Sequence, residues 1–165
     1  MEESNIKIIK HSGIFTLTTE QVLNVGLEDA WEFFSSPVNL QKITPKHMGF
    51  KITSDIAKKA YAGQIITYNI GLLPGVKSSW VTEITQVEDK SFFIDEQRFG
   101  PYKMWHHEHW FESIDGSKTI MKDKISYKLP FGVLGLIAQN IFIKKQLKQI
   151  FNYRFNTLET LFNGK

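Results

Sequence analysis

The stretch that decides the fold is KMWHHEHWFESIDGSKTIMKDKISYKL, residues 103–129. Two alternating segments flank the turn signal Asp115-Gly116, so the stretch predicts an antiparallel hairpin. In the second segment Lys122, Lys124 and Lys128 share one face, which we expect to meet solvent. The opposite face of the hairpin carries mostly aromatic and apolar residues, and it is expected to line the interior of the domain.

The rest of the chain supplies more strands and a helix to cover them. Further strands are predicted at about Ile14–Asn24, Gly49–Ser54, Gln64–Leu72, Ser78–Val87 and Phe92–Phe99. Short helices are predicted over 27–34 and 38–43, and residues 133–162 keep apolar residues at helical spacing without a proline. An antiparallel sheet has one face to bury, and only this last helix is long enough to cover it. The sequence therefore predicts an α+β helix-grip fold: a curved antiparallel sheet of about seven strands around a long C-terminal helix, with two short helices after the first strand.

The composition is that of a globular domain with a wide interior. The chain has 165 residues, and we expect residues 1–165 to form one ligand-binding domain. Thirteen Phe, five Tyr and four Trp are many for this length, and such side chains fill wide spaces or line apolar cavities. The absence of cysteine excludes disulfides and cysteine-ligated metal sites.

The charge and the hydropathy of the chain argue against nucleic acid as a partner and against a membrane-spanning segment. A net charge of +3 without a clustered basic stripe argues against nucleic acid, and no glycine-rich phosphate loop follows a strand. The longest apolar stretch, Leu129–Ile143, is interrupted by proline, glycine and polar residues and is too short to span a bilayer. Because the N-terminal residues lack the apolar run of a secretory signal, a cytoplasmic location is expected.

Three stretches resemble the START-like superfamily, also named SRPBCC, and most closely its bacterial ligand-binding branch related to polyketide cyclases and lipid transport proteins. They are DAWEFF with SPVNL and ITP within residues 29–45, GPYKMWHHEHWF at 100–111, and DKISYKLPFG at 123–132. The resemblance runs from about Phe15 to Phe162. It implies a helix-grip fold with a ligand cavity between sheet and helix. It does not imply one activity, because the superfamily spans carriers, cyclases and regulators.

Pairing across the Asp115-Gly116 turn predicts which residues face inward. It places Phe111 opposite Met121, His109 opposite Asp123, His107 opposite Ile125 and Trp105 opposite Tyr127. The same alternation carried across Gly100-Pro101 places Phe93, Asp95, Gln97 and Phe99 inside, and leaves a ladder of mixed charge outside: Glu96, Arg98, His106, Glu108, Lys122 and Lys124. The expected ligand contacts are Phe93, Gln97, Trp105, His107, His109, Phe111, Met121, Asp123, Ile125 and Tyr127.

The inner face contains a His–Asp pair with two interpretations. Buried carboxylates and imidazoles need partners, and the expected pair is His109 with Asp123, or His107 with Asp123 if the register slips. In an enzyme, the histidine would act as a general base on a carbonyl substrate and Asp123 would orient it. In a binding protein, the same pair would orient a ligand or fix the sheet.

The spacing His107-x-His109 also raises the question of a metal. Sites of the cupin type need a carboxylate a few residues later on the same face, and Glu112 has the wrong parity and spacing for this role. His106 points to the other face, which leaves Asp123 as a remote third ligand. Since the identity of donor residues alone is a weak argument for a metal, we expect no metal and no cofactor.

The function favoured by the sequence is the binding or transport of an apolar or aromatic small molecule, such as a lipid, an isoprenoid or a polyketide-like compound. The alternatives are a cyclase, dehydratase or isomerase that uses the His–Asp pair, and a module that contacts a protein partner. The apolar, glycine-containing run at residues 130–137 is either a flexible lip that admits the ligand or an ordinary strand-to-helix corner. Any membrane contact there is expected to be transient, and the oligomeric state stays open.

Overall fold

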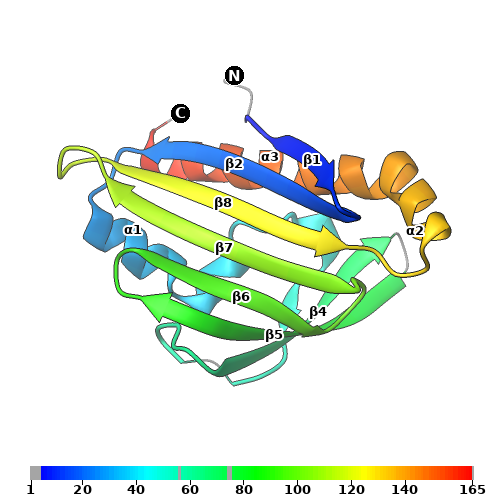
Figure 1. The fold of residues 1–165 in the computed structure, drawn as a ribbon. Coiled ribbons are helices and arrows are strands. Elements are labelled where there is room, and N and C mark those ends of the chain that lie inside the picture. Colours follow the sequence, from blue (N-terminus) through cyan, green and yellow to red (C-terminus); the bar gives the residue numbers. More distant parts are fainter. Residues whose placement is uncertain (1–4, 56, 74–75, 165) are drawn as a thin grey trace.

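A single curved antiparallel sheet bends around the C-terminal helix in the computed structural model, which describes residues 5–55, 57–73 and 76–164 (Figure 1). In the described residues the sheet has eight strands in the order β1-β2-β8-β7-β6-β5-β4-β3. Their bounds are β1 (Lys7–His11), β2 (Ile14–Leu23), β3 (Lys51–Ile52), β4 (Gln64–Leu73), β5 (Val76–Glu88), β6 (Phe92–Phe99), β7 (Met104–Ser113) and β8 (Thr119–Lys128).

Helices follow the second and the last strand. A short helix, α1 (Leu27–Phe34), leads into two 3₁₀ turns, η1 (Pro37–Gln41) and η2 (Lys46–Met48). The C-terminal helix is continuous and consists of α2 (Val133–Ala138), a π-helical turn η3 (Gln139–Ile143) and α3 (Lys144–Phe162). In Figure 1 this helix, in orange and red, passes behind β2, and α3 contacts that strand.

The predicted fold class is confirmed, with one strand more than expected. The extra strand is β1, whose residues KIIKH are mostly exposed and pair only with β2 at the edge of the sheet. A strand with so little burial leaves no clear alternation in the sequence, which is why it was missed. The helix over 27–34 is confirmed, whereas the second predicted helix is the 3₁₀ turn η1.

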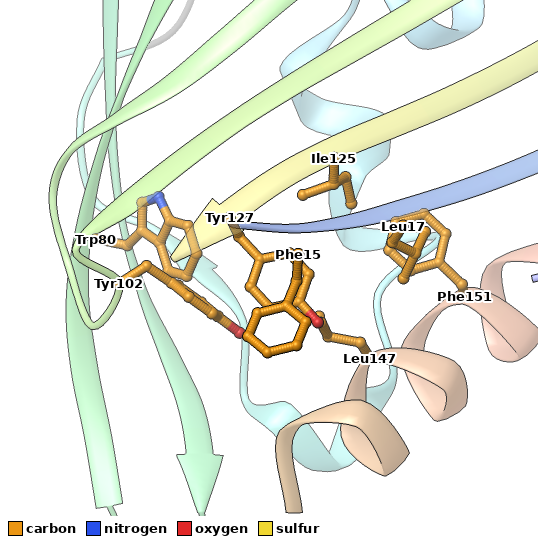
Figure 2. Packing of buried hydrophobic residues seen from close by; sticks show 8 residues of the cluster. All are labelled: Phe15, Leu17, Trp80, Tyr102, Ile125, Tyr127, Leu147 and Phe151. Atoms are coloured by element: carbon orange, nitrogen blue, oxygen red, sulfur yellow. The ribbon is translucent and has the colours of Figure 1, made fainter. Parts of the chain in front are cut away.

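Two clusters of buried side chains fill the space between sheet and helices. The first joins β2, β5, β8 and the turn before β7 to α3, as Figure 2 shows: Phe15, Leu17, Trp80, Tyr102, Ile125, Tyr127, Leu147 and Phe151. The second joins α1, the segment between η1 and η2, and the end of α3 to β2, β6, β7 and β8: Leu23, Trp31, Ile43, Phe93, Phe111, Met121 and Leu158. Each cluster therefore ties the C-terminal helix to the sheet.

The predicted hairpin register is confirmed residue by residue. Phe111 pairs with Met121, His109 with Asp123, His107 with Ile125 and Trp105 with Tyr127. The outer ladder is confirmed as well, and ion pairs join Arg98 to Glu83, His106 to Glu96 and Lys124 to Glu108.

The prediction that Phe99 faces inward is wrong. The pairing of β5 with β6 passes from Thr82–Gln97 to Val81–Phe99, so that Arg98 is an extra residue on β6. Such a bulge reverses the alternation beyond it, and Phe99 is 66% exposed.

Candidate functional site

A cavity of about 170 Å³ lies between the inner face of the sheet and α3. Its wall is mostly apolar and comes from most elements of the fold. The apolar lining includes Phe33, Phe34, Ile43, Met48, Ile66, Ile70, Trp80, Ile84, Phe93, Trp105, Leu147, Ile150 and Phe151. The size is close to that of engineered apolar cavities, about 150 Å³, that accommodate benzene.

One region of the wall carries a cluster of charged and ionisable side chains. Asp95 on β6, His107 and His109 on β7, and Arg154 on α3 all line the cavity. Successive residues of a strand point to opposite faces, so His107 and His109 share the inner face while His106 and Glu108 lie outside. Strand pairing then sets Asp95 directly opposite His107.

Each imidazole of this cluster lies between two carboxylates. The Nε2 of His107 donates to Asp123 Oδ1 at 2.8 Å, and its Nδ1 is 3.5 Å from Asp95 Oδ2. The Nε2 of His109 donates to Asp95 Oδ2 at 2.9 Å, and its Nδ1 is 3.1 Å from Asp123 Oδ1, although this last approach lacks hydrogen-bond geometry. The two rings are 3.7 Å apart between centroids.

Arg154 completes the cluster from the helix. Its Nη1 donates to Asp123 Oδ1 at 3.1 Å, and both side chains are almost fully buried. Its guanidinium lies over the ring of Phe151, 4.8 Å from the ring centroid. The buried Nε of Arg154 finds no hydrogen-bond partner among the described residues. Asp123 is thus clamped between one helical cation and the histidines of β7.

The pKa values of these groups are shifted by burial and by one another. Burial acts to raise the pKa of Asp123, but the charge of Arg154 and the two histidines outweigh it and hold that pKa well below its usual range. The pKa of Asp95 is likewise lowered by the histidines against the effect of burial. Burial lowers the pKa of His107, whereas the two carboxylates overcome burial at His109 and raise its pKa. The cluster therefore favours two carboxylate anions, which Arg154 and the two histidines surround.

Aromatic side chains hold the histidines in place. Phe93 stacks on His109 with 4.1 Å between ring centroids. Phe151 and Trp105 meet His107 edge to face, each at 6.2 Å. Since the rings are packed from several sides, the directions of their nitrogen atoms are fixed.

The structure separates the predicted ligand contacts into two groups. Phe93, Trp105, His107 and His109 line the cavity. The side chains of Phe111, Met121, Ile125 and Tyr127 are packed within the two core clusters, and Asp123 lies beside the cavity behind the histidines. Gln97 binds the turn before β7, where its amide donates to the carbonyl of Tyr102 at 2.6 Å and accepts from the Tyr102 N–H at 3.1 Å.

Arg154 is the residue of the site that sequence reasoning missed. A signal for it existed, because Arg154 occupies the apolar stripe of the C-terminal helix, in the spacing Leu147, Phe151, Arg154, Leu158. All four of these side chains are buried. A charged residue in such a stripe must find a buried partner, and Asp123 was the one already expected on the inner face.

The turn from β8 into the C-terminal helix has an unusual backbone and an exposed apolar surface. Phe131, before α2, has a positive φ of 65° and is 82% exposed. Val133 and Leu134 in α2 and Ile141 in η3 are also largely exposed. A bulky residue in the left-handed region is strained, and strain of this kind gathers at functional segments. The two interpretations of this run, a flexible lip and an ordinary strand-to-helix corner, both stay predictions.

Solved structures with the same architecture match nearly the whole chain. A START superfamily protein from Mycobacterium smegmatis superposes on 90% of this chain and 97% of its own, with a TM-score of 0.65 and 10% identity. The protein has a START-like fold. A protein from Rhodobacter sphaeroides covers 95% of this chain and 97% of its own at a TM-score of 0.67 and 14% identity. A protein from Staphylococcus epidermidis covers 96% of this chain and 94% of its own at a TM-score of 0.65 and 17% identity.

Sequence comparison adds no nearer relative, since no protein-family profile and no curated protein matches the chain. The START-like fold is in general a ligand-binding fold, and its helix and sheet here enclose the cavity described above. Among the described residues, no helix combines the length and the apolar character needed to cross a membrane.

Proposed function

We propose that the protein binds a small, mostly apolar organic molecule that carries one acidic or hydrogen-bond-accepting group. The observation that carries this proposal is the cavity of about 170 Å³, whose apolar wall is broken by one charged cluster. An apolar pocket with a few convergent polar groups is the usual form of a small-molecule site, in which the polar groups fix orientation.

The size of the cavity favours a single ring or a short branched chain over a long lipid. A cavity of about 150 Å³ accommodates benzene, and the one here is only slightly larger. Among the broad classes expected from the sequence, a monocyclic aromatic or short isoprenoid compound fits best.

The charged cluster is the reason for proposing an acidic or hydrogen-bond-accepting group on the ligand. The buried Nε of Arg154 has no hydrogen-bond partner among the described residues. Arg154 lines the cavity, and a buried donor without a partner costs about 1–3 kcal/mol. A ligand carboxylate or carbonyl near Arg154 would recover part of that free energy.

The test uses benzoate and toluene, which have similar size and differ in charge. Trp80 and Trp105 line the cavity, so binding should change their fluorescence, and calorimetry gives the affinity. We expect both compounds to bind in the presence of EDTA, benzoate more tightly than toluene. An Arg154→Met variant should lose the preference for benzoate and keep toluene binding.

A matched pair of variants locates the binding. Ala60 lines the cavity and Ala62, two positions along, is exposed. Ala60→Phe should fill the cavity and abolish binding, while Ala62→Phe should leave it unchanged. Equal affinities in both variants, with melting temperatures like that of the wild type, would place the ligand elsewhere and defeat the proposal.

The second candidate is an enzyme that abstracts a proton next to a carbonyl. It is favoured by one observation: both histidines line the cavity, and Asp123 lies within 3.1 Å of one nitrogen of each ring, as the carboxylate that orients a general base does, while Asp95 lies beside the other nitrogen. Acetophenone fits the size of the cavity, and uptake of deuterium into its methyl group from D₂O measures such a step. If the His109→Gln variant loses deuterium uptake but still binds acetophenone, the result supports the enzyme. If uptake with the wild-type protein equals that in buffer alone, the result excludes the enzyme for this substrate.

A further inference from the structure

We propose that Asp95, His107 and His109 form a binding site for one divalent transition-metal ion at the charged end of the cavity. Each residue offers one ligand atom, and these atoms all lie within 4.8 Å of one another. Two imidazoles and one carboxylate are a donor set typical of zinc and of non-haem ferrous iron.

The distances are close to those that a metal requires. The Oδ2 of Asp95 lies 2.9 Å from His109 Nε2 and 3.5 Å from His107 Nδ1. A tetrahedral ion with bonds of about 2.1 Å holds neighbouring ligand atoms about 3.4 Å apart. An ion can therefore enter after rotations of side chains alone, with the three backbone positions kept by the pairing of β6 with β7.

Asp123 lies beside both histidines, in the position of a carboxylate that supports the ligand histidines of a metal site. It lies beside the nitrogen of each histidine that points away from Asp95: it accepts a hydrogen bond from Nε2 of His107 at 2.8 Å and is 3.1 Å from Nδ1 of His109, without hydrogen-bond geometry. Ligand histidines usually give their second nitrogen to such a carboxylate, which fixes the ring and the tautomer. Arg154 in turn holds Asp123 from the helix.

The site would keep an open position toward the cavity. Asp95, His107 and His109 all line the cavity, while Asp123 and its partners lie behind them. Three protein ligands leave a fourth position for water or for a bound molecule, as in metal sites that act on substrates. Arg154 pairs with Asp123, whereas the ionic contacts of Asp95 among the described residues are with the two histidines, so a cation held by Asp95, His107 and His109 is favoured by charge.

This proposal departs from the sequence-based expectation of no metal. That expectation considered Glu112 and Asp123 as the carboxylate ligand, and neither was suitable. The structure supplies Asp95 instead, from the neighbouring strand β6 and opposite His107. The site also goes beyond the proposed binding function, which is tested in the presence of a chelator.

Co²⁺ and Zn²⁺ are suitable probes, because Co²⁺ bound by nitrogen and oxygen ligands in four or five coordination absorbs visible light. We expect the wild-type protein to bind one ion per chain, with a visible Co²⁺ spectrum and competition by Zn²⁺. Asp95→Asn, His107→Gln and His109→Gln should each weaken Zn²⁺ binding at least 100-fold in calorimetry. Asp123→Asn should weaken it by roughly 10–100-fold, since it removes only a supporting contact.

His106→Gln is the matched control, because His106 lies next to the site on the same strand and points outward to Glu96. It should bind both ions as the wild type does.

Failure of the wild type to bind one ion per chain overturns the proposal. Binding that persists in His107→Gln and His109→Gln and is lost in His106→Gln also overturns it, as that pattern marks a surface histidine. Thermal melts of every variant show whether a lost site reflects a lost fold, and toluene binding in EDTA reports on the cavity independently of the metal.

Discussion

Replacing Arg154 with methionine should cost the protein several kcal/mol of stability. Met has similar length and keeps the packing, but it removes the cation that holds Asp123 Oδ1 at 3.1 Å. Taking one partner from a buried ion pair costs about 3–5 kcal/mol, because the other charge is left without compensation. Asp123 keeps the hydrogen bond from His107, so we expect the lower end, about 3 kcal/mol. For a domain of this size that corresponds to a fall in melting temperature of roughly 6–12 °C.

Equilibrium unfolding in urea with linear extrapolation measures this loss. The control is Arg98→Met, which removes the exposed pair with Glu83, where the arginine side chain is 48% exposed. An exposed ion pair contributes at most about 1 kcal/mol, so this variant should stay within that margin of the wild type. If Arg154→Met is no less stable than Arg98→Met, Arg154 does not compensate a buried charge, and the reasoning about the cluster fails.

Three further predictions concern the surroundings of the cavity. Gln97→Leu should lose about 2 kcal/mol in urea unfolding, because it leaves the N–H and the carbonyl of Tyr102 without their partner; a loss below about 0.5 kcal/mol would contradict this role. Tyr127→Phe should lose about 1–2 kcal/mol, since the amide of Gln139 donates to the Tyr127 hydroxyl at 2.7 Å, and adding Gln139→Leu should recover most of the loss; no recovery would refute the pairing. Phe131→Ser with Leu134→Ser should leave stability within about 0.5 kcal/mol, as both side chains are exposed, and should slow the association of benzoate in stopped-flow fluorescence; an unchanged rate would make the segment an ordinary corner.

The hairpin of β7 and β8 could be predicted because one turn fixes its register. Asp115-Gly116 sets the pairing, and the lysines of β8 show which face is outside. From these two facts the pairing of His109 with Asp123 follows, and the register confirms it. The hydrogen bond to Asp123, however, comes from His107, a contact that was expected only if the register slipped. The prediction failed at Phe99, since a bulge at Arg98 leaves no mark in the alternation.

The boundary between core and cavity could not be predicted from strand parity. The alternation of side chains along a strand shows which residues lie on the inner face of the sheet. The position of α3 then decides which of these residues are packed in the core and which line the cavity. Ile125 and Tyr127 are covered by Leu147 and Phe151 in the first core cluster, whereas His107 and His109 stay open to the cavity. Arg154 has a signal in the sequence, because it is a charged residue within the apolar stripe of the helix, but the sequence alone does not show that the stripe meets Asp123.

Native mass spectrometry of the protein purified from its own host, compared with the mass of the denatured chain, is the measurement that decides whether the cavity holds a ligand. The wild type should carry a non-covalent adduct with the mass of a small organic molecule, and Ala60→Phe should not. A wild-type protein whose native and denatured masses agree, and which binds neither benzoate nor toluene, would contradict the account of the cavity as a binding site.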